Sequence, residues 1–177
     1  MHNLKKKKKK RLIFRDILRL IRRYFPSTNV QSVDIDEAWK FKREFFWNAF
    51  KALEFNGIKG DYVEFGSHSG MTFRLAYDEI YKRKINMHMW AFDSFKGIPV
   101  AKSYMDRHPN WKKGAMFTNI ESFHKICQAH NIPREAYTLV PGFYDETLTN
   151  IPKDSPPKDI ALAYVDCDMF SSTQTVL

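Results

Sequence analysis

Cysteine and long apolar runs are scarce in this sequence of 177 residues. The two cysteines, Cys127 and Cys167, lack metal-ligand spacing, which argues against a disulfide scaffold or a zinc site and favours buried free thiols in a reducing compartment. No apolar run approaches the roughly 20 residues that span a bilayer. Arg15, Asp16 and Arg19 interrupt the first apolar stretch, so the pattern of a secretory signal is missing as well. These absences favour a cytoplasmic protein of one domain.

Acidic residues are nearly missing from the N-terminal segment. The lysine run 5–10 and five arginines place eleven positive charges in the first 23 residues, against one acid, Asp16. From Tyr24 onward, 18 basic residues face 19 acidic ones. The net charge of +9 therefore belongs to a tail, and the rest of the chain is close to neutral.

Apolar residues of this tail recur at helical spacing, with most arginines on the other side. The apolar positions are Ile13, Ile17, Leu20, Ile21 and Tyr24. A basic amphipathic helix over residues 11–25, preceded by the lysine run, suits an arm packed on its own domain or on a second subunit, or a peripheral contact of residues 5–25 with the anionic inner membrane surface. It also suits non-specific phosphate binding, without specific recognition of nucleic acid. Residues 1–29 are predicted as tail and linker, and residues 30–177 as the folded body.

Helical and strand patterns alternate along the body. Helices are expected over 36–55, 72–83 and about 117–127, and apolar strands over 62–65, 87–92, 137–140 and 160–165. The first helix is expected to bury a face made of Ala38, Phe41, Phe45, Ala49 and Leu53. Continuous apolar strands that alternate with helices predict an α/β fold with a parallel sheet covered on both faces.

Polar and glycine residues gather where these strands end, at 64–70, 93–99, 142–145 and 166–168. Ligands of parallel sheets bind beyond the carboxyl ends of the strands, so these segments predict one shared site. In the first turn, Gly66 would permit a close backbone approach and Gly70 a tight helix entry, although the spacing is not the dinucleotide fingerprint. Asp93 suits the two hydroxyls of a ribose, or alternatively a loop cap.

Asp166 and Asp168 lie two residues apart after the last strand. If the chain is still extended there, both carboxylates point to the same side. One would suit Mg²⁺ and the other a general base beside a substrate hydroxyl, and the residues alone do not decide which is which. The alternative is a pair of caps at a strand end.

Four strings carry a resemblance to a known family: YVEFGSHSG (62–70), WAFDSFKGIP (90–99), PGFYDETL (141–148) and IALAYVDCDMFSST (160–173). They resemble the macrocin O-methyltransferase family, which is related to the novobiocin and mycinamicin sugar O-methyltransferases. The resemblance runs from about Asp36 to the chain end. It implies a Rossmann-like class I methyltransferase sheet, mostly parallel, and transfer of a methyl group from S-adenosylmethionine to a sugar hydroxyl with the help of Mg²⁺.

The resemblance also implies roles for individual residues. Asp166 is expected as the metal ligand and Asp168 as the catalytic base. The expected cofactor-binding residues are Glu64, Phe65, Gly66, Ser67, Gly70, Thr72, Asp93, Ser94 and Phe95.

The family's sheet has seven strands, and the pattern here is expected to stop after the fourth. The strand at 160–165 would then present an unpaired edge, and the family's later Asp-Asp metal ligands would be missing. The sequence thus predicts a truncated methyltransferase domain that has little or no activity alone, as a fragment or a remnant.

Two other functions fit parts of the sequence. Asp-x-Asp after an apolar strand also suits a metal-dependent glycosyltransferase that uses a nucleotide sugar, although this does not explain Glu64, Gly66 or Asp93. A non-catalytic remnant that binds anionic surfaces through its tail is the second. The acceptor is expected to be a small molecule with a hydroxyl group, and a homo-oligomer is compatible with the pattern.

Overall fold

The computed structural model describes residues 35–149, 156–157 and 159–177, with side chains described from Trp39 onward. The predicted tail and linker, residues 1–29, lie outside the described residues. The helices and strands are α2 (Ile35–Phe55), β1 (Asp61–Phe65), α3 (Met71–Arg83), β2 (Met89–Asp93), α4 (Ile120–Ala129), β3 (Tyr137–Pro141), α5 (Tyr144–Thr147), β4 (Ile160–Val165) and α6 (Phe170–Val176). Short 3₁₀ turns, η1 and η2, occupy Tyr104–Asp106 and Arg134–Ala136.

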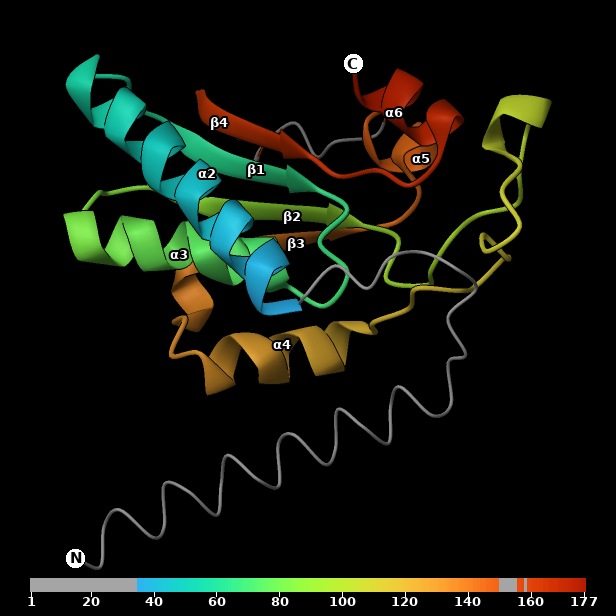
Figure 1. The fold of residues 1–177 in the computed structure, drawn as a ribbon, viewed down its shortest axis with the longest axis horizontal. Helices are drawn as coiled ribbons and strands as arrows, with labels where there is room; N and C mark the ends of the chain where they lie inside the picture. The colour runs from blue at the N-terminus through green and yellow to red at the C-terminus, as the bar shows by residue number, and fades with distance from the viewer. Residues whose placement is uncertain (1–34, 150–155, 158) are drawn as a thin grey trace, which may run out of the picture. The chain divides into compact units, whose positions relative to one another are not determined.

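The four described strands form one parallel sheet in the order β3-β2-β1-β4. This confirms the predicted parallel α/β architecture, and the carboxyl ends of all four strands meet at one edge (Figure 1). β4 pairs with β1, and within the described residues its other edge has no strand beside it. Ile160 and Ala163 of that strand are exposed, as expected for an edge strand.

One face of the sheet is covered by α2, α3 and α4 (Figure 1). Phe73 of α3 lies at the centre of this core, where its ring contacts Tyr62 of β1, Phe123 of α4 and Tyr137 of β3. The buried stripe of α3 consists of Phe73, Ala76 and Ile80, and the helix lies where the sequence predicted it. Burial of large aromatic rings supplies most of the free energy that fixes these helices on the sheet.

The predicted core face of α2 is confirmed at Leu53 but wrong at Phe41 and Phe45. Phe41 and Phe45 are largely exposed, whereas Phe46, Phe50 and Leu53 are buried. The helix carries aromatic residues around most of its circumference, so periodicity alone does not select the buried face. The selected face is the one whose rings, Phe46 and Phe50, pack against Tyr62 of β1.

The opposite face of the sheet has a smaller core of Val63, Phe65, Trp90 and Phe92. Short helices α5 and α6 cover it, through partly buried residues that include Tyr144 and Val176. Helix α5 spans four residues and α6 seven, lengths too short for a helical periodicity to emerge from the sequence.

Two further expectations concern α4 and the thiols. Helix α4, expected from about residue 117, begins at Ile120, so Phe117 stands before it and is exposed. Phe123 is buried, and Cys127 is buried as predicted. Both cysteines are free thiols; Cys127 is buried and Cys167 is partly buried. None of the described helices combines the length and apolar character that crossing a membrane requires.

Candidate functional site

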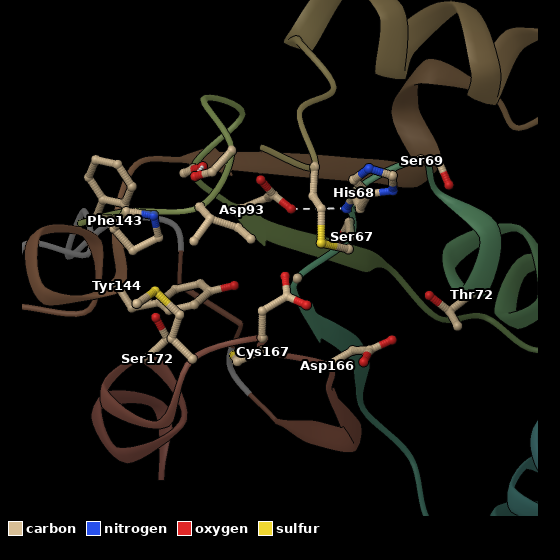
Figure 2. A pocket seen from close by; sticks show the side chains of 18 of the residues that line it. Ser67, His68, Ser69, Thr72, Asp93, Phe143, Tyr144, Asp166, Cys167 and Ser172 are labelled. Atoms are coloured by element: carbon tan, nitrogen blue, oxygen red, sulfur yellow. Dashed lines mark hydrogen bonds between the residues drawn. The ribbon is translucent and has the colours of Figure 1, made fainter. Parts of the chain in front are cut away.

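A cavity of about 250 Å³ opens at the carboxyl ends of the strands. Side chains that follow each of the four strands surround it (Figure 2). The predicted site residues in its wall are Gly66, Ser67, Thr72, Asp93, Ser94, Asp166 and Asp168. Four strand ends thus converge on one cavity, as the sequence predicted. Glu64, Phe65, Gly70 and Phe95 do not line it, and the structure places them behind its wall.

Gly66 lets two strand ends come together. Its φ is +93°, and a Cβ atom at this position would collide with the backbone carbonyl of Asp166. The amide of Gly66 also donates a 2.9 Å hydrogen bond to the carbonyl of Phe92. The close approach expected of this glycine is therefore to the backbone after β4, and it brings the turn after β1 beside Asp166.

Gly70 starts α3 from a left-handed conformation, with φ +66°. A Cβ atom here would stand 3.2 Å from the ring of Phe123, so the glycine permits the tight packing of α4 on the start of α3. The first turn of α3 contributes Met71 and Thr72 to the cavity wall.

Glu64 is fully buried beneath the cavity. Its carboxylate accepts hydrogen bonds from the hydroxyls of Tyr62 and Thr72, the latter at 3.0 Å. Burial raises its pKa to about 7, and hydrogen bonds from Tyr62, Thr72 and Ser67 only partly oppose this effect. Through Thr72, which lines the cavity, Glu64 fixes the wall from behind.

Ser67 carries a buried hydroxyl without a hydrogen-bond partner of normal geometry, and within the described part of the chain no other buried side-chain polar atom shares this condition. The residue is 2% exposed and belongs to the cavity wall. Buried polar atoms are nearly always satisfied. The hydroxyl stands beside the buried Glu64 carboxylate, whose pKa it helps to lower, and so links the cavity wall to Glu64.

Asp93 is held in place by backbone amides. The amide of His68 donates to one carboxylate oxygen at 2.9 Å (Figure 2), and the amide of Phe95 donates to the other at 2.8 Å. Each oxygen of a carboxylate can accept a second hydrogen bond. Asp93 is therefore both a loop cap and an oriented acceptor at the cavity, so the two readings of this residue are compatible. Ser94 beside it donates to the carbonyl of Gly97.

Phe143 and Tyr144 follow β3 and line the cavity. The Tyr144 hydroxyl donates to the carbonyl of Phe92 at 3.3 Å. Burial raises the pKa of Tyr144 well above its ordinary value, so the side chain stays neutral. It anchors the loop, and Phe143 is left to present an apolar surface to a ligand.

Asp166 and Asp168 follow β4 and both belong to the cavity wall. Partial desolvation, followed by the negative charge of Asp166, raises the pKa of Asp168. The structure thus brings this acidic pair to the same cavity as Asp93.

Lys42 of α2 is a site residue that the sequence reasoning missed. Its Nζ lies 3.5 Å from a carboxylate oxygen of Asp166, and the residue lines the cavity. Lys42 stands four positions before Phe46 and so shares the buried face of α2. A single lysine on an otherwise apolar face could have indicated a site residue. It was overlooked because a different face of α2 was expected to be buried.

The donor set for a metal is small. Among the residues that the structure describes, no group of three histidine, cysteine, aspartate or glutamate side chains is placed to hold an ion. Asp166 and Asp168 offer two carboxylates, and the ammonium group of Lys42 already stands beside the first. These two carboxylates supply only part of the oxygen shell of Mg²⁺, and water or substrate oxygens would have to complete it.

Comparison with known proteins supports the fold and the family. The sequence model of the macrocin-O-methyltransferase family matches residues 42–177. No curated protein sequence matches the chain. The structure of the O-methyltransferase NovP aligns with a TM-score of 0.66 and 22% identity over 77% of this chain and 57% of that one. The calicheamicin methyltransferase CalS11 aligns with a TM-score of 0.65 and 20% identity over 81% of this chain and 59% of that one.

At these identities the two structures establish the fold, and they confirm the Rossmann-like sheet predicted from the sequence. The chain spans less than two thirds of the length of either structure.

Proposed function

This chain belongs to the macrocin-O-methyltransferase family, and on that premise we propose that it binds S-adenosylmethionine and methylates a hydroxyl group of a sugar. The observation that carries the proposal is that Asp93 and the turn after β1 line one cavity. Asp93 offers oriented acceptors for ribose hydroxyls, because a backbone amide holds each of its carboxylate oxygens. Phe143 provides an apolar wall beside them, suited to a flat base.

Asp166 and Asp168 are proposed to have different roles in the reaction. When bound, S-adenosylmethionine supplies a methyl group on a positively charged sulfur. Asp168 accepts the proton of the acceptor hydroxyl, and its raised pKa makes it a stronger base than an ordinary aspartate. Asp166, whose charge Lys42 partly neutralises, orients the acceptor. Most of the rate gain comes from holding the hydroxyl in line with the methyl group.

We also propose that Asp166 is a ligand of Mg²⁺, as the resemblance implies. Magnesium is commonly held by one or two carboxylates and completes its shell with water or substrate oxygens. Because the described residues supply only this pair of carboxylates at the cavity, no step of the proposed chemistry depends on the ion.

The proposed site residues also include Glu64, Phe65, Gly66, Gly70 and Phe95, which support the cavity from behind its wall. We further propose a cytoplasmic protein whose segment 5–25 contacts an anionic membrane surface. Removing that segment would then weaken association with anionic vesicles, while an Asp93 variant would leave it unchanged.

Calorimetric titration tests the central proposal without knowledge of the acceptor. S-adenosylhomocysteine is expected to bind the full chain, and UDP-glucose is expected to give no heat. Binding of the nucleotide sugar alone would replace the methyltransferase proposal with a glycosyltransferase. Binding of neither would leave a protein without the proposed cofactor site.

A further inference from the structure

The segment between β2 and α4 projects from the carboxyl end of the sheet as a long loop (Figure 1). Its two ends are paired: the amide of Ile98 donates to the carbonyl of Ala115, and the amide of Gly114 donates to the carbonyl of Ile98, both at 2.9 Å. Residues 99–113 therefore leave and return at one place, as in a compact surface loop. We refer to residues 96–117 as the rim loop.

The one acidic residue of the rim loop points inward. Asp106 is 1% exposed, and its carboxylate accepts hydrogen bonds from the amides of Lys102 and Ser103 at 3.0 and 3.1 Å and from the amide of Ser171 at 2.8 Å. These bonds lower its pKa, with the bond from Ser171 contributing most. The acid thus fastens the loop to the start of α6 and adds no charge to the outer surface.

The outer surface of the rim loop is cationic. It carries Lys96, Lys102, Arg107, Lys112 and Lys113, all exposed. Lys102 pairs with Asp145 at 2.6 Å. The other four form no ion pair with any carboxylate of the described residues.

The rim loop also exposes large apolar side chains to solvent, although their exposure is unfavourable in water. Tyr104 is 78% exposed and Val100 60%, and Phe117 reaches 55%. Met105 and Met116 are about half exposed. Aromatic and aliphatic side chains interleaved with lysine and arginine are typical of segments that lie at the interface of an anionic membrane.

We propose that the rim loop docks on an anionic lipid surface, with its cations on the headgroups and its apolar side chains at the acyl boundary. A second copy of the chain fits less well, because two loops of the same positive charge repel each other. Nucleic acid also fits less well, because Val100 and Met105 are poor partners for stacked bases. Lipid accommodates both the charge and the aliphatic surface.

The rim loop also forms part of the cavity mouth, since Gly97, Ile98, Pro99 and Met116 belong to the cavity wall. A docked loop therefore holds the mouth at the lipid surface. Combined with the proposed function, on which this step rests, the acceptor is then a sugar carried by a lipid rather than a freely diffusing one.

Hydrogen exchange of the full chain, with and without vesicles, tests the docking locally. Vesicles of phosphatidylcholine mixed with phosphatidylglycerol are expected to protect the amides of residues 100–117, and vesicles of phosphatidylcholine alone are not. A loop variant with Lys96→Gln, Arg107→Gln, Lys112→Gln and Lys113→Gln is expected to lose this protection, with vesicle affinity of the loop reduced roughly 1,000-fold. High salt should weaken the protection as well.

A matched control carries Lys40→Gln, Lys51→Gln, Lys59→Gln and Lys125→Gln, which remove four exposed charges outside the loop, and it should keep the protection. Substituting Tyr104 and Phe117 by serine should weaken protection by vesicles but not by a soluble polyanion such as heparin. Two results would overturn the proposal: vesicle binding that leaves residues 100–117 unprotected, or an equal loss of protection in the loop variant and in the matched control. Titration with S-adenosylhomocysteine is scored separately, so that failure of the cofactor site and failure of docking remain distinguishable.

Discussion

The backbone amide of His68 donates a 2.9 Å hydrogen bond to a carboxylate oxygen of Asp93. The bond joins the turn after β1 to the end of β2, two segments that are separated along the chain and adjacent in the sheet. It fixes the direction of the carboxylate before any ligand arrives. Preorganised acceptors of this kind lower the cost of binding because little reorganisation is required.

Asp93→Asn should weaken binding of S-adenosylhomocysteine by about tenfold or more, because loss of one charged hydrogen bond costs about 1.5–3 kcal/mol. The asparagine side chain would also place its NH₂ group against the backbone amide of His68 or of Phe95, where it cannot accept a hydrogen bond. Calorimetry measures the change, and Glu121→Gln, an exposed substitution on α4, is the control. Equal affinities of wild type and Asp93→Asn would remove Asp93 from the cofactor site.

Glu64→Gln should change how stability depends on pH. Burial raises the pKa of Glu64 from 4.5 to about 7, so the folded state holds a proton that the unfolded state releases. The free energy of unfolding of the wild type should therefore fall as the pH rises from about 5 to about 7, on the order of 2–3 kcal/mol relative to the variant. Thermal melts of both proteins from pH 5 to pH 8 provide the measurement, and parallel curves would contradict the prediction.

Lys42→Gln should strengthen Mg²⁺ binding by up to about fivefold, since an exposed ion pair contributes at most about 1 kcal/mol. The ammonium group lies 3.5 Å from Asp166 and competes with a cation for that carboxylate. Calorimetric titration with MgCl₂ compares the wild type, this variant and Lys51→Gln, in which a lysine outside the cavity is changed. Asp166→Asn should abolish the heat; if it does not, the ion binds elsewhere.

Asp106→Asn should loosen the rim loop. One carboxylate oxygen becomes an NH₂ group that cannot accept from the amides it faces. Exchange of the amides of Lys102, Ser103 and Ser171 should accelerate roughly tenfold, while β1 keeps its protection. Asp145→Asn, which breaks only the exposed pair with Lys102, should change exchange little. If Asp106→Asn and Asp145→Asn show the same exchange rates, Asp106 does not hold the rim loop to α6.

Gly66→Ala should destabilise the protein more than Gly57→Ala. Both glycines have positive φ values, but a Cβ atom meets nothing within 4 Å at Gly57 and meets the carbonyl of Asp166 at Gly66. The strained backbone alone should cost about 1–2 kcal/mol, and the collision should add about 1–3 kcal/mol at Gly66. Urea unfolding of the two variants measures the difference. Similar midpoints would show that the backbone near Asp166 can move to accommodate the Cβ atom without loss of stability.

The sequence by itself determined which segments are strands and which end of the sheet carries the cavity. Runs such as Ile160–Val165 are apolar without interruption, and polar residues such as Asp93 follow them directly. These are local patterns, because strand burial and the end of a strand leave their mark on neighbouring residues. The domain boundaries and the tail remain predictions from the same source.

Only the tertiary structure decided which face of α2 is buried, and with it the position of Lys42 beside Asp166. It also decided that Asp106 turns inward to bind Ser171, 65 positions away along the chain. Such pairings depend on how helices and loops pack in space, and neighbouring residues carry no record of them. Aromatic side chains on several faces of one helix satisfy the same periodic pattern, and only packing against Tyr62 and its neighbours selects among them.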